Sequence, residues 1–317
     1  MKKSSVSAVL TFFLFTIPLF AQSQDLKKYT KSIDLIYMKD VLTYLSDDTL
    51  EGRGTSTIGQ LIAGTMIARE FERNGMIPFY HRTFTQSFQK DTLIVRNIIG
   101  VVRARYYSEK YIVVSAHYDH LGILGGKIYN GADDNASGVA MMMTLAKLFS
   151  DMRAAGDGVY TNIIFAAFDG KEHNMVGSDA FVKKLPISKN NIICNINIDQ
   201  IGTIFAPPTV DTNYVLVLGT KSNRGYKKIV ESANINSGSN LSINYNYYGS
   251  PDFADIFYKA SDQYSFIKAG IPALVFTSGI HMHTYKPTDD YYFMNYPVLF
   301  KRTALIFNLI NIISSSL

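Results

Sequence analysis

The chain of 317 residues contains one cysteine, Cys194, so it cannot form an internal disulfide. Cys194 lies in an apolar run that is typical of a strand, where it is most simply a small core residue. The sequence also lacks low-complexity tracts, internal repeats and any linker that would divide it. Because 47% of the residues are hydrophobic, the chain can bury a full core. We therefore expect one large globular domain.

No cluster of basic residues is present, which argues against a nucleic-acid partner. The formal net charge is +5, from 31 basic and 26 acidic residues. Leaving out residues 1–21 removes two lysines and no acids, which lowers the charge to +3. The basic residues are scattered, and a pair such as Lys183-Lys184 is typical of a solvated helix face. We expect no nucleic-acid binding.

The first residues have the layout of a secretory signal peptide. Lys2 and Lys3 precede an apolar stretch from Val9 to Phe20, and Ala21 ends it. The stretch is too short for a spanning helix, and no cysteine follows it to carry a lipid. We expect residues 1–21 to be removed and residues 22–317 to form a single exported domain, periplasmic or extracellular, with no membrane span after cleavage.

Predicted strands and helices alternate along the rest of the chain. Runs rich in β-branched and aromatic residues predict strands over residues 92–102, 111–116, 162–168, 192–198, 214–218 and 271–277. Apolar residues at helical spacing, or helix-like composition, predict helices over residues 57–74, 137–151, 178–185, 225–234, 262–269 and 296–313. The alternation predicts a three-layer α/β/α sandwich with a mixed, mostly parallel central sheet.

Five potential metal ligands are spread over more than half of the chain, and most follow directly on a predicted strand. They are His117, Asp134, Glu172, Asp199 and His283. Because the carboxyl ends of parallel strands share one edge of a sheet, we expect these side chains to converge there. Two imidazoles and three carboxylates suit a pair of zinc ions. Asp119, two residues beyond His117, is placed to orient the imidazole.

The motifs around these residues, in this order, resemble peptidase family M28, a family of zinc aminopeptidases. The resemblance runs from Leu45 to Asn308. The motifs that carry it include Glu51-Gly-Arg-Gly54, Ala116-His-Tyr-Asp119, Gly131-Ala-Asp-Asp-Asn-Ala-Ser-Gly138, Phe168-Asp-Gly-Lys-Glu172, Asn197-Ile-Asp-Gln-Ile-Gly202 and Lys286-Pro-Thr-Asp289.

The resemblance implies a role for each ligand. Asp134 would bridge two zinc ions, His117 and Asp199 would complete one shell, and Glu172 with a C-terminal histidine would complete the other. The metals would polarise the scissile carbonyl and lower the pKa of a bridging water. The substrate would be a peptide whose free α-amino group is held by acidic groups.

Position 171 departs from the family pattern. The family has a glutamate there, the general base that takes a proton from the metal-bound water. This chain has Lys171, and a charged lysine has no lone pair to accept a proton. Three interpretations stay open. Lys171 is driven neutral and acts as the base; another acid such as Asp119, Asp133 or Asp169 replaces it; or the chain binds metal or peptide without hydrolysis.

The C-terminal motif departs as well. Family members commonly have the ligand histidine four residues before the aspartate, which is Tyr285 before Asp289 here. We favour His283 as the metal ligand, with His281 as its rival. Gln263 stands where a histidine commonly follows Ser-Asp in the family. Tyr285 and Gln263 are therefore candidate substrate-binding residues.

These observations predict an exported zinc-dependent aminopeptidase-like hydrolase that removes N-terminal residues from peptides. One alternative is a catalytically impaired homologue that binds metal or peptide. The reason to consider it is Lys171, which replaces the family's general base. Another is a glutaminyl cyclase, because those enzymes resemble the same scaffold with a single zinc. The group Tyr245, Tyr247 and Tyr248 is compatible with an aromatic pocket wall or lid.

Overall fold

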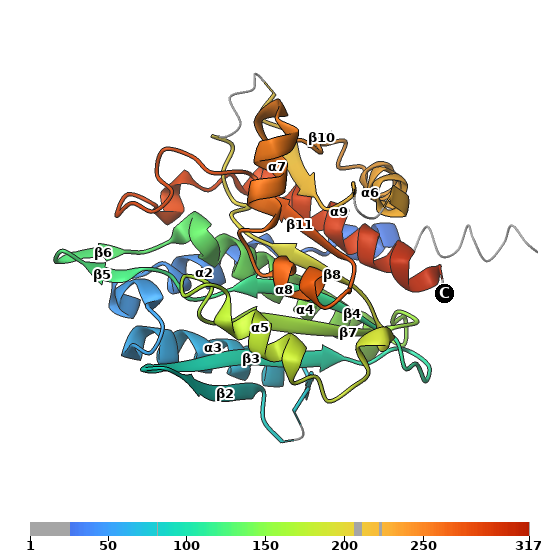
Figure 1. Ribbon diagram of the computed structural model, residues 1–317. Coiled ribbons are helices and arrows are strands. Elements are labelled where there is room, and N and C mark those ends of the chain that lie inside the picture. The colour runs from blue at the N-terminus through green and yellow to red at the C-terminus, as the bar shows by residue number, and fades with distance from the viewer. Residues whose placement is uncertain (1–25, 81, 206–210, 222–223, 317) are drawn as a thin grey trace, which may run out of the picture.

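The computed structural model describes residues 26–80, 82–205, 211–221 and 224–316 (Figure 1). The predicted signal peptide, residues 1–21, lies outside the described residues. Among the described residues, nine strands form one sheet in the order β1-β3-β7-β4-β8-β11-β9-β10, with β2 paired to β3. The strands of this sheet are β1 (Ile77–Pro78), β2 (Thr85–Lys90), β3 (Leu93–Val102), β4 (Tyr111–His117), β7 (Asn162–Phe168), β8 (Ile192–Ile198), β9 (Tyr214–Leu218), β10 (Ser242–Asn244) and β11 (Ala273–Thr277). A separate hairpin joins β5 (Gly122–Leu124) to β6 (Lys127–Tyr129).

The centre of the sheet is parallel and its flanks are mixed. Strands β7, β4, β8 and β11 run parallel to their neighbours in this series. Strand β3 is antiparallel to β7, and β9 is antiparallel to β11. Every residue of β7 is buried, as expected for a strand covered on both faces. The mixed sheet confirms the predicted fold class.

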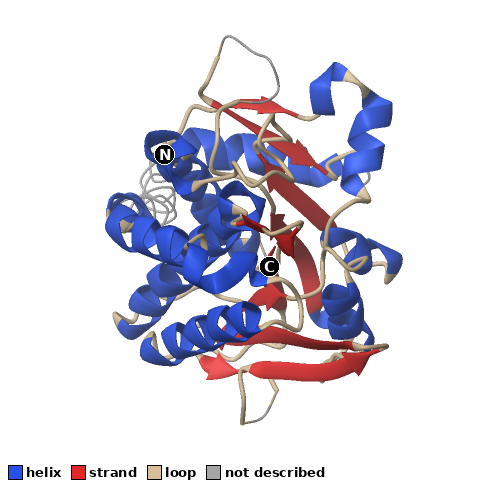
Figure 2. Ribbon diagram, turned by 90° about the vertical axis from the view of Figure 1, so that its left-hand side faces the viewer, coloured by secondary structure: helices blue, strands red, loops and turns tan. Residues whose placement is uncertain are grey.

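Helices cover both faces of the sheet (Figure 2). Side chains alternate across a strand, so in β4 Ile112 and Val114 face one helical layer and Val113 faces the other. The first layer contains α2 (Leu35–Leu45), α3 (Ile58–Arg73), α4 (Gly138–Ala154), α6 (Arg224–Asn236) and α9 (Tyr296–Ser315). The second contains α5 (Val176–Lys183) and α8 (Gln263–Lys268), while α7 (Pro251–Tyr258) packs beside β9 and β11.

Helix α9 is long and apolar enough to cross a membrane by length and composition, and it is the one such helix found among the described residues. However, 78% of its most apolar 18-residue segment is buried inside the molecule. Its buried Arg302 donates hydrogen bonds to the backbone oxygens of Tyr214, Ile201 and Thr203. The helix is therefore a core helix, and its Arg302 connects the loop after β8 to strand β9.

Candidate metal centre

The parallel strands carry the candidate ligands to one edge of the sheet. His117 is the last residue of β4, Glu172 lies in the turn after β7, and Asp199 follows β8 directly. Asp134 lies in the irregular turn Ala132–Ser137 that leads into α4. The structure thus brings together four of the five predicted ligands, although they are spread between positions 117 and 199 of the sequence.

The first ligand group consists of His117, Asp134 and Asp199. Nε2 of His117 lies 3.3 Å from Oδ1 of Asp134 and 3.3 Å from Oδ1 of Asp199. Nδ1 of His117 lies 3.1 Å from the carbonyl oxygen of Asp119, to which it can donate. This contact leaves Nε2 as the nitrogen that can bind a metal ion once it has given up its proton. The group therefore offers one nitrogen and two carboxylate oxygens to a cation.

Electrostatics within the first group favour a positive charge at its centre. Burial and Lys171 lower the pKa of His117, but Asp199, Asp119 and Asp134 outweigh them and raise it well above the ordinary value. Burial raises the pKa of Asp199, but Lys171 and His117 lower it by more, so the net shift is downward. The Asp199 carboxylate therefore stays ionised and attracts a cation.

The second ligand group consists of His120, Asp134 and Glu172, and it shares Asp134 with the first. Nδ1 of His120 lies 4.0 Å from Oδ2 of Asp134 and 4.0 Å from Oε1 of Glu172. Both ring nitrogens of His120 and both carboxylate oxygens of Asp134 are buried without a hydrogen bond among the described residues. Buried polar atoms of this kind are costly unless a partner satisfies them, and a metal ion is such a partner. The donor set therefore fits zinc.

Gly131 and Asp289 shape the turn that presents Asp134. Gly131 has φ of 57°, and a Cβ atom there would lie 2.5 Å from Cγ of His120, so glycine allows the imidazole to approach. The Asp289 carboxylate accepts hydrogen bonds from the backbone N–H groups of Asp133 and Asp134, at 2.9 and 3.0 Å. The turn is thus shaped by the close approach of His120 at Gly131 and by the hydrogen bonds to Asp289.

Asp119 positions the turn after β7. Its Oδ1 accepts a hydrogen bond from the backbone N–H of Lys171, and its Oδ2 accepts one from that of Glu172, both at 3.1 Å. The side chain is fully buried, and Oδ1 lies 3.7 Å from Nδ1 of His117. Asp119 therefore helps to hold the candidate ligands His117 and Glu172 in position, through its contact with the imidazole and its hydrogen bond to the backbone.

The sequence matches a known protein family. The family model described as Peptidase family M28 matches residues 97–310, more than half of the chain. The chain belongs to peptidase family M28. A probable zinc metalloprotease of Leptosphaeria maculans is 24% identical over 298 residues, which cover 81% of this chain and 66% of that protein. The chain spans less than two thirds of the length of this and the next curated relatives.

Solved structures of low sequence identity share the fold. The LapA aminopeptidase of Legionella pneumophila has a TM-score of 0.70 and 17% identity, covering 93% of this chain and 74% of that chain. The glutaminyl cyclase of Porphyromonas gingivalis has a TM-score of 0.69 and 14% identity, covering 88% of this chain and 98% of that chain. These similarities establish the α/β architecture of the M28 chain.

Lys171 points into the metal centre of this M28 protein. Its Nζ lies 2.9 Å from Oε1 of Glu172, 3.6 Å from Oδ1 of Asp134 and 3.3 Å from the hydroxyl of Tyr285. Burial lowers the pKa of Lys171, but the attraction of Asp134, Asp199 and Glu172 outweighs it and raises the pKa well above the ordinary value. These contacts favour a charged ammonium over a neutral amine that could act as a base.

The histidines after β11 belong to neither ligand group. Nδ1 of His283, the predicted ligand, lies 2.9 Å from Oγ1 of Thr288, and its ring stacks on Phe293 with 4.3 Å between centroids. Nε2 of its rival His281 lies 3.0 Å from Oδ2 of Asp133. The second ligand group contains His120 instead, which forms an isolated parallel bridge with Gly54 beyond the end of β4.

The two candidate substrate-binding residues differ in their surroundings. Tyr285 places its hydroxyl beside Lys171 and its ring parallel to that of His120, with 6.4 Å between centroids. Gln263 is fully buried: its Oε1 accepts from Nδ2 of Asn197, and its Nε2 donates to the carbonyl oxygen of Tyr258. Tyr285 therefore borders the metal centre, whereas both polar ends of Gln263 are used within the protein.

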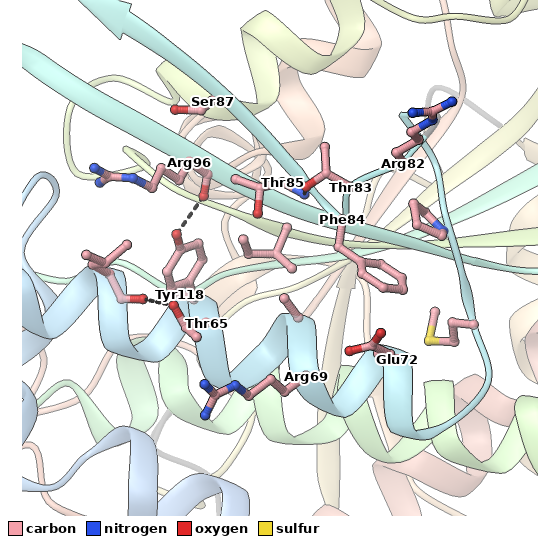
Figure 3. Close-up of a pocket in the computed structure, with 16 residues that line it drawn as sticks. Thr65, Arg69, Glu72, Arg82, Thr83, Phe84, Thr85, Ser87, Arg96 and Tyr118 are labelled. Atoms are coloured by element: carbon pink, nitrogen blue, oxygen red, sulfur yellow. Dashed lines mark hydrogen bonds between the residues drawn. The ribbon is translucent and has the colours of Figure 1, made fainter.

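A cavity of about 270 Å³ adjoins the metal centre. Lys171, Asp199 and Tyr285 line one side of it. A larger cavity of about 540 Å³ lies between α3 and strands β2 and β3, with Tyr118 at its wall (Figure 3). None of the candidate ligands lines this larger cavity. The smaller cavity is therefore the one next to the site.

Proposed function

We propose that the protein is an exported zinc-dependent aminopeptidase. The observation that carries the proposal is the buried carboxylate of Asp134, shared by two histidine–carboxylate groups. Zinc bound there would act as a Lewis acid on a peptide carbonyl and lower the pKa of bound water. Membership of family M28 and the fold shared with an aminopeptidase of Legionella pneumophila support this proposal.

The cavity beside the metal centre favours an apolar N-terminal side chain. The rings of Tyr247 and Phe257 stack at 4.0 Å between centroids, and Leu218, Val275 and Ile280 complete an apolar wall. A residue of the aromatic group noted in the sequence, Tyr247, thus lines this cavity. Its volume of about 270 Å³ is enough for one large side chain. We infer a substrate whose first residue resembles leucine or phenylalanine.

We expect purified protein to hydrolyse leucyl and phenylalanyl nitroanilides about tenfold or more faster than the glutamyl compound, because the cavity wall is apolar. Removal of metal by a chelator is expected to lower the rate about 100-fold or more, and zinc is expected to restore it. The measurement is kcat/KM for each substrate before and after chelation. Activity that survives chelation would refute the zinc proposal, and a preference for the glutamyl substrate would refute the assignment of the cavity.

A second candidate function is peptide binding without turnover. It is favoured by Lys171 and by the hydrogen bonds that the nearby aspartates already accept. Asp119 accepts two backbone N–H groups, as described above. Asp133 accepts from Gly202 N, Thr203 Oγ1 and His281. Asp169 accepts from Gln60 and from the backbone N–H of Arg96. Each acid that could replace the general base is thus engaged elsewhere.

Assays of binding, hydrolysis and ammonia release distinguish the aminopeptidase, the peptide-binding protein and a glutaminyl cyclase. Binding of leucyl peptides by zinc-loaded protein without hydrolysis, together with turnover gained by Lys171→Glu, supports the binding protein. Release of ammonia from an N-terminal glutaminyl peptide, with leucyl substrates inert, supports a glutaminyl cyclase. Calorimetry, nitroanilide release and ammonia release therefore give a different pattern for each function.

Export rests on residues 1–21 and is tested by the mature N-terminus. We expect protein isolated from the periplasm or the medium to begin at Gln22, because Ala21 ends the apolar stretch. Intact-mass measurement checks this result. A variant that lacks residues 2–21 is expected to stay in the cytoplasm, and its export would contradict the prediction.

A further inference from the structure

Lys171 contacts the two carboxylates of the second ligand group. Its Nζ lies 2.9 Å from Oε1 of Glu172, the same oxygen that faces Nδ1 of His120 at 4.0 Å. Nζ also lies 3.6 Å from Oδ1 of Asp134. The ammonium group of Lys171 is thus already in contact with two of the three side chains that would hold a second metal ion.

Lys171 also sets the charge next to the second ligand group. Its ammonium already supplies a positive charge to Asp134 and Glu172, the two carboxylates that would hold a second metal ion. A dication on the same two carboxylates would lie within a few ångströms of this charge in a buried site, where like charges repel strongly. The contacts of Lys171 therefore favour a single zinc ion.

The surrounding structure holds Lys171 in this position. Its backbone N–H donates to Asp119, and its side chain is 5% exposed. Nζ lies 3.3 Å from the Tyr285 hydroxyl and 5.5 Å from the centre of the Tyr285 ring. Tyr285 in turn lies parallel to His120. A second zinc ion could bind only if this ammonium moved away from its partners.

We propose that the Lys171 ammonium is a built-in cation that takes the place of a second metal ion. The centre then binds one zinc ion tightly on His117, Asp134 and Asp199. A second ion on His120 and Glu172 binds roughly 100-fold or more weakly, because two positive charges would lie within a few ångströms of each other. This inference rests on the proposed function only for the identity of the metal.

The test is metal content, which does not depend on turnover. After equilibration at a free zinc concentration that saturates only tight sites, we expect one zinc ion per wild-type chain and two per Lys171→Glu chain. Lys171→Met, which removes the charge but keeps similar bulk, is expected to bind the second ion more tightly than wild type. Lys183→Met is the matched control, because Lys183 is exposed and pairs with Asp179. Two tight ions in wild type, or none, would overturn the proposal.

Histidine variants locate the ion even if the Lys171 variants fail to fold. His117→Ala is expected to lose the tightly bound zinc, and His120→Ala is expected to keep it. Loss of zinc from His120→Ala with retention in His117→Ala would refute the proposal. A one-zinc protein without peptidase activity would refute the proposed function and leave this inference standing, whereas an active two-zinc protein would do the reverse.

Discussion

Asp134→Asn is expected to abolish tight zinc binding and to lower peptide hydrolysis by about 1000-fold or more. Asp134 is the one residue common to both ligand groups, and both of its carboxylate oxygens are buried without a hydrogen bond among the described residues. An amide keeps the shape of the side chain but removes the negative charge that attracts the cation. Metal content and kcat/KM measure the two effects.

The matched control is Asp151→Asn, which changes the same atoms at the exposed end of α4, where Asp151 pairs with Lys147. Exposed pairs of this kind contribute little, so metal content and activity are expected to stay at the wild-type level. Circular dichroism shows whether each variant is folded. Folded Asp134→Asn protein that retains a full equivalent of zinc would contradict the assignment of Asp134 as a ligand.

The strands at the centre of the sheet can be predicted because they are buried on both faces. Their apolar runs are continuous, as in β7, where every residue is buried. The sequence pattern does not predict strand β2 at the edge, since its sequence Thr-Gln-Ser-Phe-Gln-Lys is mostly polar and none of its residues is buried. Helix α2 is also absent from the predicted elements, although Met38, Val41, Leu42 and Leu45 show helical spacing.

The candidate site is predictable where a ligand follows a strand. His117 and Asp199 lie at or directly after a strand end, so the register of the sheet fixes their positions, whereas Glu172, four residues beyond β7, is found through the motif Phe168-Asp-Gly-Lys-Glu172. His120 lies three residues beyond β4 and outside the motif Ala116-His-Tyr-Asp119, so neither signal places it. The signal that could have found it is Gly131, whose missing side chain makes room for the imidazole. His283 lies six residues beyond β11, and spacing along the chain does not determine the direction of such a loop.

Arg53 is expected to control the stability of the fold around the metal centre. The side chain is fully buried and donates hydrogen bonds to four backbone carbonyl oxygens, those of Leu45, Tyr118, Asn130 and Gly131. It thereby joins the end of α2 to the segment after β4 and to the turn that presents Asp134. Burial lowers the pKa of Arg53 to about 10, so the guanidinium stays charged at neutral pH.

Arg53→Met is therefore expected to lower the free energy of unfolding by about 3–5 kcal/mol, because it leaves buried acceptors without donors. Arg53→Lys keeps the charge but not the planar fork, and we expect an intermediate loss. Arg73→Met is the control, since the Arg73 side chain is 75% exposed, and although its partner Glu70 is largely buried, a change of about 1 kcal/mol or less is expected. Urea unfolding of metal-free protein measures all three variants. A loss below about 1 kcal/mol for Arg53→Met would show that water or a rearranged backbone satisfies the four carbonyls, and that the guanidinium does not hold the turn.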